Sequence, residues 1–285
     1  MIIISFILLS NTLPAQIISD SLVVEGHYRS FHFYKPVTNT SGASLVFILH
    51  GSGGNGKAMM DRSRKLIEKS SSEKILLVYP DGYKKYWNEC RKAATSLANQ
   101  ENIDENTFFD GMINYFKSKH RINPRQVFAI GTSGGGHMAY KLALTMPEKF
   151  KAITAIIANL PDTDNMDCAE SKVALPVMIV NGTADQVNPY EGGLVDLGNV
   201  KMGRVRSTDR TFNYWASLAG YIGDPLKTLL PDNDPSDGKT IERYTYKQRG
   251  KPEIALLKVI GGKHDYPNDI DVHVEAWEFF KRQIP

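Results

Sequence analysis

A serine enclosed by glycines is the feature of this sequence with the clearest chemical meaning. Ser133 lies in the pattern Gly131-Thr-Ser-Gly-Gly135, after an apolar run and before a helix-like segment. A serine on a sharp strand-to-helix turn needs nearly side-chain-free residues two positions before and after it. The segment lacks the lysine of a phosphate-binding loop and the spacing of a dinucleotide fingerprint. The pattern therefore predicts a nucleophilic serine.

A serine hydroxyl needs a base and a carboxylate to become reactive at neutral pH. Asp185 follows the apolar segment VMIVNG, and His264 follows the last apolar segment, IALLKVIGG. Both residues are expected just beyond strands, and the order Ser133, Asp185, His264 is that of an α/β-hydrolase. These three residues are predicted to be the nucleophile, the acid and the base.

Other residues compete for these roles. His137 lies one turn into the helix after the serine and is expected to be structural, and His273 is expected on the solvated face of the final helix. His50 belongs to a glycine-rich loop with another task. Asp162 or Asp164, which follow the preceding strand, stay open as alternative acids because acid placement varies between hydrolases.

Acyl transfer also needs hydrogen-bond donors for the oxyanion. One is the backbone N–H of Gly134, directly after the nucleophile, and the second is expected from a loop after an early strand. The segment HGSGGNG fits that loop, with the N–H of Ser52 as donor. The hydroxyl of Ser52 is an alternative donor, and a simple flexible turn is the alternative reading of the loop. Each such donor contributes on the order of 100- to 1,000-fold in rate.

Composition excludes several classes of function. The 285 residues carry a formal net charge of +3 without a basic run, which argues against a nucleic-acid partner. The histidines are scattered and the two cysteines have no metal-binding spacing, so neither a metal nor another cofactor is expected.

The amino terminus indicates export. Residues 1–16 have a short apolar core followed by polar and small residues, which predicts a cleaved signal peptide and no membrane span in the mature protein, although the usual basic start is missing. A secreted or periplasmic location would allow a disulfide between Cys90 and Cys168. Two free cysteines are the alternative, since spacing alone cannot show proximity.

The elements that must position these residues alternate along the chain. Short apolar runs alternate with helical patterns, which predicts one α/β domain over residues 17–285, with a mostly parallel sheet and helices on both faces. Sites in such sheets form at the carboxyl ends of the strands. Two antiparallel strands are expected at the start, and residues 57–70 are expected to form one helix. Residues 192–250 read as an insertion before the last strand, near the substrate.

The order of motifs resembles a known family. The segments LHGSGGNG, YPDG, WNEC, ENIDENTFF, NPRQVFAIGTSGGGHMAYKLA, PVMIVNGTADQVNPYEGG and GGKHDYP follow one another as in secreted polyhydroxybutyrate depolymerase-like and feruloyl esterase-like proteins of carbohydrate esterase family one. The resemblance covers residue 22 to the end. It implies an α/β-hydrolase fold, the same three catalytic residues and carboxylic ester substrates.

The chain departs from this family beside its catalytic residues. Gly134 stands where Asn is frequent, Asn181 where His is frequent, and Lys263, Asp265 and Tyr266 surround the base where Gly, Thr and Trp are usual. These positions border the substrate, so the ester can be feruloyl, acetyl or polyhydroxybutyrate-like, and the substrate can be polymeric.

Several aromatic residues are expected near the mouth of the site. Their rings could stack on a sugar or a phenolic group, or could serve packing. The candidates are Trp87, Tyr86, Tyr190 and Tyr83.

The sequence thus predicts a secreted serine esterase that works through an acyl-enzyme. A peptidase of the prolyl-oligopeptidase kind would share the fold and the triad, but it generally carries a propeller domain. A non-catalytic glycan-binding protein on the same fold is a rival from another class, and it would not need an activated serine.

Overall fold

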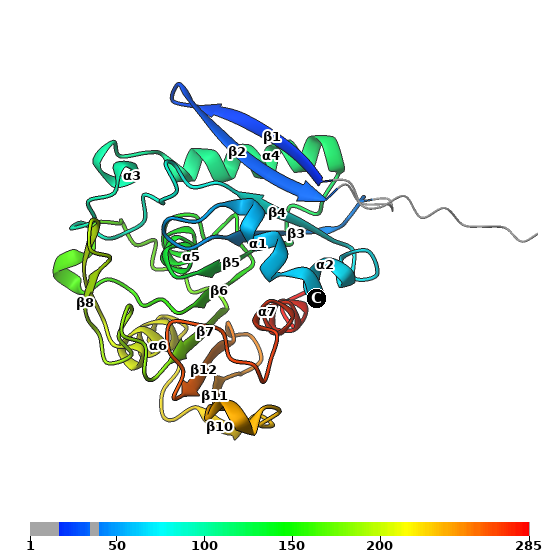
Figure 1. Ribbon diagram of the computed structural model, residues 1–285. Helices are drawn as coiled ribbons and strands as arrows, with labels where there is room; N and C mark the ends of the chain where they lie inside the picture. Colours follow the sequence, from blue (N-terminus) through cyan, green and yellow to red (C-terminus); the bar gives the residue numbers. More distant parts are fainter. Residues whose placement is uncertain (1–16, 35–39, 285) are drawn as a thin grey trace, which may run out of the picture.

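The computed structural model describes residues 17–34 and 40–284, and the predicted signal peptide lies outside them. Their main feature is a ten-stranded sheet in the order β1-β2-β4-β3-β5-β6-β7-β12-β11-β10. The six central strands from β4 to β12 run parallel, and the strands at both ends are antiparallel. Figure 1 shows the β1–β2 hairpin at one end of the sheet and β10 and β11 at the other.

Short apolar segments form the strands because both faces of the central sheet are covered. The strands of the large sheet are β1 (Ile17–Val24), β2 (His27–Tyr34), β3 (Ser44–Leu49), β4 (Ile75–Pro80), β5 (Val127–Thr132), β6 (Ala152–Ile156), β7 (Val177–Gly182), β10 (Leu226–Leu229), β11 (Thr240–Tyr246) and β12 (Ile254–Ile260). A separate two-stranded sheet consists of β8 (Gly193–Asp196) and β9 (Lys201–Val205).

Most of the helices pack against the large sheet. The helices are α1 (Gly56–Arg62), α2 (Arg64–Ser70), α3 (Leu97–Gln100), α4 (Glu105–His120), α5 (Gly134–Thr145), α6 (Thr208–Leu218) and α7 (Val272–Lys281), with short 3₁₀ turns η1 (Thr163–Asn165) and η2 (Pro235–Asp237). Helix α5 is buried on nearly all sides. Residues of α4, α5 and α6 share one apolar core, and residues of α1, α2 and α7 share the other. Strand β3 contributes side chains to both cores, because Phe47 faces the first core and its neighbours Val46 and Ile48 face the second.

Most predicted elements are confirmed. The expected opening strands form a hairpin in which Ile17 pairs with Tyr34 and Val24 with His27. The one helix expected over residues 57–70 is instead divided at Ser63 into α1 and α2. The buried hydroxyl of Ser63 donates to the Met59 carbonyl at 2.8 Å and lies 2.8 Å from the Tyr79 hydroxyl. The Ser63 hydroxyl thus competes with backbone N–H groups for a helical carbonyl. The spacing of apolar residues gives no sign of such a contact.

The segment 192–250 differs from the expected insertion. It contributes β11, which pairs antiparallel with β12 along its whole length, and β10, which forms the edge of the large sheet. Helix α6 packs against β7 and β12. Strands β10 and β11 and helix α6 are therefore part of the central fold, whereas β8 and β9 form a separate small sheet. Strand β10 is exposed along its whole length, as is common at the edge of a sheet.

Candidate active site

The nucleophile turn has the strain that its sequence predicts. Ser133 links β5 to α5 with φ 52° and ψ −117°, a conformation that non-glycine residues rarely adopt. A β-carbon at Gly131 would lie 1.9 Å from the Gly135 carbonyl oxygen, and one at Gly135 would lie 2.4 Å from the Leu49 carbonyl oxygen. Backbone atoms cannot yield at such distances, so both positions require glycine. The turn presents the Ser133 hydroxyl above the sheet.

The structure brings together the three residues of the expected triad. The His264 Nε2 atom lies 3.0 Å from the Ser133 Oγ atom, and His264 Nδ1 lies 2.7 Å from Asp185 Oδ2. The three side chains come from loops after β5, β7 and β12, which run parallel and therefore end at the same edge of the sheet. With Nδ1–H donating to Asp185, Nε2 is free to accept the serine proton.

The acid is held in a fixed orientation. The side chain of Asp185 is 2% exposed, against 23% for His264. Its Oδ1 atom accepts hydrogen bonds of 2.8 Å from the backbone N–H groups of Val187 and Asn188, which leaves Oδ2 for the imidazole. These hydrogen bonds compensate the desolvation of the carboxylate. The arrangement fixes one tautomer of the His264 imidazole.

The loop expected to supply the second oxyanion donor packs on the nucleophile turn. A β-carbon at Gly134 would lie 2.9 Å from the Ser52 backbone nitrogen and 2.6 Å from its Oγ atom. Gly134 begins α5, so its N–H is free of helical hydrogen bonds. The two proposed donors are thus neighbours, and both the amide and the hydroxyl of Ser52 lie beside the turn.

His50 stabilises this glycine-rich loop through two hydrogen bonds, a role that the sequence alone did not define. Its Nδ1–H donates to the Gly51 carbonyl at 2.8 Å, and its Nε2 accepts the Gly82 N–H at 2.9 Å. Burial lowers the pKa of His50, which favours the neutral imidazole that these two bonds require. The indole N–H of Trp87 donates to the His50 carbonyl at 2.9 Å. In the sequence, the only sign of this role was the position of His50 directly before the glycine-rich segment.

The aromatic residues expected at the mouth lie in different environments. Trp87 is 2% exposed, and its ring centroid lies 4.9 Å from that of His50. Tyr190 is 3% exposed, and its hydroxyl donates to Asp209 at 2.8 Å. Tyr86 is only partly buried, and so is Tyr83. Trp87 and Tyr190 therefore serve packing as they stand, and the accessible rings are those of Tyr83 and Tyr86.

The competing acid and histidines lie in other contacts. Asp162 pairs with Arg210 at 3.0 Å, whereas Asp185 contacts His264 at 2.7 Å. His137 is buried, and burial lowers its pKa well below the usual range, as expected of a structural histidine. The prediction for His273 is wrong, because this residue is 1% exposed. It faces the ring of Tyr266 from the first turn of α7, where the loop after β12 folds over the helix.

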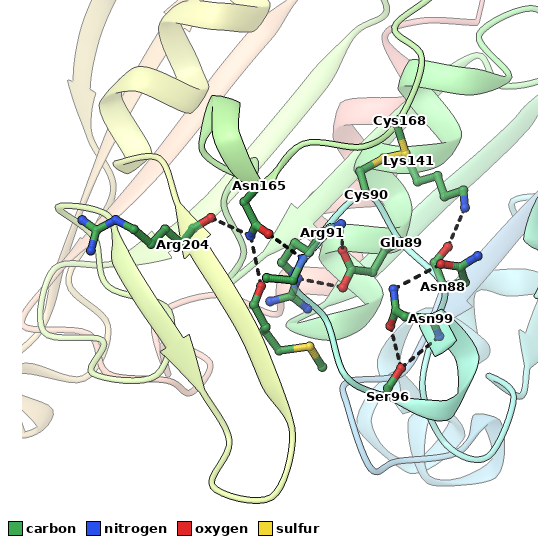
Figure 2. A network of polar contacts seen from close by, with 12 residues as sticks. Asn88, Glu89, Cys90, Arg91, Ser96, Asn99, Lys141, Asn165, Cys168 and Arg204 are labelled. Carbon is green, nitrogen blue, oxygen red and sulfur yellow. Dashed lines mark hydrogen bonds and ion pairs between the residues drawn. A yellow bond between two sulfur atoms is a disulfide. The ribbon is translucent and has the colours of Figure 1, made fainter. Parts of the chain in front are cut away.

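The two cysteines are joined in a disulfide. Cys90 and Cys168 pair with a Cα–Cα distance of 5.0 Å and tie the loop after β4 to the segment after η1 (Figure 2). Beside the bridge, Arg91 Nε donates to Glu89 at 2.7 Å, and both side chains are 2% exposed. The Lys141 ammonium of α5 donates to the Asn88 carbonyl at 2.6 Å.

A chain of amides fixes the remainder of this loop. Asn99 Nδ2 donates to Asn88 Oδ1 at 3.1 Å, and the Ser96 hydroxyl donates to Asn99 Oδ1 at 2.6 Å. On the other side, Asn165 of η1 accepts the Ala93 N–H at 2.8 Å through its Oδ1 atom, and its Nδ2 atom donates to the Arg204 carbonyl of β9 at 2.9 Å (Figure 2). The loop that carries Trp87 is therefore anchored to α5, η1 and β9, and its Trp87–His50 hydrogen bond supports the glycine-rich loop of residues 50–56.

The fold and the site define the class of this protein as an α/β-hydrolase. Residues 38–195, more than half of the chain, match the model of the Phospholipase/Carboxylesterase family. The chain therefore belongs to this family of ester hydrolases.

Individual relatives are more distant. The chain is 27% identical over 257 residues to the "Putative esterase NocK" of Nocardia uniformis subsp. tsuyamanensis, covering 86% of this chain and 73% of that protein. It is 28% identical to feruloyl esterase B of Piromyces equi over 56% of this chain, but it spans only 29% of that enzyme. An acetyl xylan esterase from Aspergillus awamori superimposes with a TM-score of 0.64 at 17% identity, covering 93% of this chain and 99% of the other. At that identity the likeness shows the fold alone.

Two further observations concern residues 17–34 and 40–284. No cluster of three or more His, Cys, Asp or Glu side chains in these ranges could hold a metal ion. No helix within them is long and apolar enough to cross a bilayer.

Proposed function

We propose that this protein is a secreted serine esterase that hydrolyses carboxylic esters through an acyl-enzyme. The observation that carries the proposal is the continuous relay from Ser133 Oγ to His264 Nε2 at 3.0 Å and from His264 Nδ1 to Asp185 Oδ2 at 2.7 Å. Membership of the carboxylesterase family supports the ester as the substrate. The disulfide and the signal-like first 16 residues support export.

The geometry supports the following reaction. Ser133 Oγ attacks the ester carbonyl while His264 Nε2 takes its proton, and Asp185 stabilises the resulting imidazolium. The N–H groups of Gly134 and Ser52 stabilise the oxyanion of the tetrahedral intermediate. His264 then protonates the leaving alcohol, and a water molecule activated by the same imidazole hydrolyses the acyl-enzyme.

The acyl group is proposed to belong to a polymeric substrate. Relatives are named as feruloyl esterases and acetylxylan esterases, which favours feruloyl or acetyl esters of plant polysaccharide over a polyhydroxybutyrate-type polyester. Tyr83 and Tyr86 are the accessible aromatic residues that could contact a sugar or phenolic ring.

One experiment tests the reaction and its rivals. Wild-type protein should hydrolyse a nitrophenyl ester, and Ser133→Ala should abolish turnover and labelling by a fluorophosphonate probe. A pure glycan-binding protein would show neither turnover of the ester nor labelling by the probe. A peptidase would prefer peptide amides to esters. Retention of the wild-type rate by Ser133→Ala would refute the assignment of the nucleophile.

A second experiment identifies the ester. Methyl ferulate, acetylated xylan and short hydroxybutyrate oligomers are compared by their kcat/KM values. A preference above about tenfold corresponds to roughly 1.4 kcal/mol of differential transition-state binding and defines the substrate class.

A further inference from the structure

The loop that carries the catalytic base is attached to the acid strand before it reaches His264. Its Gly261 N–H donates to the Thr183 hydroxyl at 2.9 Å, and its Gly262 carbonyl accepts the Ala184 N–H at 2.8 Å. Both partners lie between β7 and Asp185. These bonds position the start of the loop relative to the acid, but they do not position the imidazole relative to the serine.

After His264 the same loop is attached to the nucleophile strand. The hydroxyl of Tyr266 lies 2.6 Å from the hydroxyl of Thr132, the last residue of β5 and the immediate neighbour of Ser133. Thr132 is 6% exposed. His264 therefore lies between an anchor on the acid side and an anchor on the nucleophile side.

The surroundings of Tyr266 keep its ring in place and its hydroxyl protonated. The ring packs edge-on against His273 of α7 at 5.5 Å between centroids, and the Arg62 guanidinium of α1 lies 5.9 Å from the ring centre. Burial raises the pKa of Tyr266, while Thr132 and Arg62 oppose this shift. A neutral hydroxyl can thus share a hydrogen bond with Thr132 throughout the working range of an esterase.

We propose that Tyr266 and Thr132 act as a pair of positioning residues, whose hydrogen bond holds the base loop in register with the nucleophile. This inference rests on the proposed triad. The catalytic contact between His264 and Ser133 spans two separate loops, and a displacement of about 1 Å at a reacting group can cost on the order of 100-fold in rate. A hydrogen bond beside that contact restricts such displacement without touching the substrate.

The test is a double-mutant cycle on a nitrophenyl ester. Tyr266→Phe and Thr132→Val each remove one hydroxyl with little change of shape. Each is expected to lower kcat about tenfold with KM unchanged within about twofold, because the lost bond affects the transition state and not substrate binding. The double variant is expected to lose no more than either single variant, since both remove the same bond.

Matched controls separate positioning from loss of stability. Thr132→Ser keeps a hydroxyl and should restore most of the activity lost in Thr132→Val. Tyr79→Phe removes a similar hydrogen bond, that of 2.8 Å to Ser63 in the same apolar core, and should lower the melting temperature while leaving kcat at the wild-type value.

Two results would overturn the inference. One is a wild-type kcat for folded Tyr266→Phe or Thr132→Val, and the other is a double variant in which the two losses multiply. Failure of the proposed function is distinguishable, since it would appear as undiminished turnover by Ser133→Ala in the same assay.

Discussion

The hydrogen bonds around Asp185 predict how its replacement by asparagine would change the protonation of His264. Oδ1 of Asp185 accepts two backbone N–H groups at 2.8 Å, and only an oxygen can satisfy them. An asparagine must therefore turn its amide nitrogen toward His264 Nδ1. That nitrogen can only donate, so the imidazole proton moves to Nε2, opposite Ser133 Oγ. The base then carries a proton where it should accept one.

The expected magnitude is large although the shape is unchanged. In a serine triad, this inversion of the tautomer lowers kcat by about 10,000-fold, which corresponds to about 5 kcal/mol of transition-state stabilisation. KM is expected to change little, because neither Asp185 nor its amide analogue contacts the substrate. The assay is steady-state hydrolysis of a nitrophenyl ester, with circular dichroism to verify that the variant folds.

A matched control comes from the competing acid. Asp162 follows β6, and its contacts are ion pairs with Arg210 at 3.0 Å and Arg204 at 3.8 Å, whose side chains are 62% and 67% exposed. Such pairs contribute little to stability, so Asp162→Asn should retain kcat within about twofold. If Asp162→Asn loses more activity than Asp185→Asn, or if Asp185→Asn retains more than a tenth of wild-type kcat, the reasoning about the acid is wrong.

The remaining predictions concern stability. The pKa of His273 is lowered by burial from 6.5 to about 4, so the unfolded chain binds a proton in this interval that the folded protein does not. Stability should therefore decrease as the pH falls from about 6.5 to 4, by up to about 3 kcal/mol from this residue. His273→Phe, which keeps an aromatic ring beside Tyr266, should show a smaller decrease in urea melts at pH 7 and pH 4.5, and an equal decrease in both proteins would contradict the assignment. The disulfide between Cys90 and Cys168 closes a loop with a sequence separation of 78, so its reduction should cost about 4 kcal/mol by restoring entropy to the unfolded chain. Denaturant midpoints with and without a reductant measure this cost, and coincident midpoints would show that the bridge does not contribute.

Local patterns were sufficient for most of the fold. The helix α4 covers the segment ENTFFDGMINYFKSKH, where apolar residues recur at helical spacing, and Asp104 caps its start by accepting the Thr107 N–H at 3.0 Å. The buried strands were likewise predictable, because each is a short apolar run in the sequence. The division of the first long helix at Ser63 was not predictable, because it depends on a contact with Tyr79, which is 16 residues away in the sequence.

Residues that depend on neighbours distant in sequence were the least predictable. The amphipathic pattern of α7 placed His273 toward solvent, but the base loop covers that turn of the helix through Tyr266. Trp87 was a candidate for either substrate stacking or packing, and the structure buries it against His50. A single sequence holds no record of which loop covers which face.

By itself, the sequence determined the nucleophile turn, since only glycines at positions 131 and 135 avoid collision around a strained serine. It also determined the class of fold, through apolar strands that alternate with helices, and the residue types that an acid and a base require. Only the tertiary structure decided that Asp185 and not Asp162 meets His264, and that Tyr266 joins the base loop to β5. The physical reason is that hydrogen bonds are short and directional, so partners separated by 79 or 134 residues become identifiable only when the sheet has brought their loops to one edge.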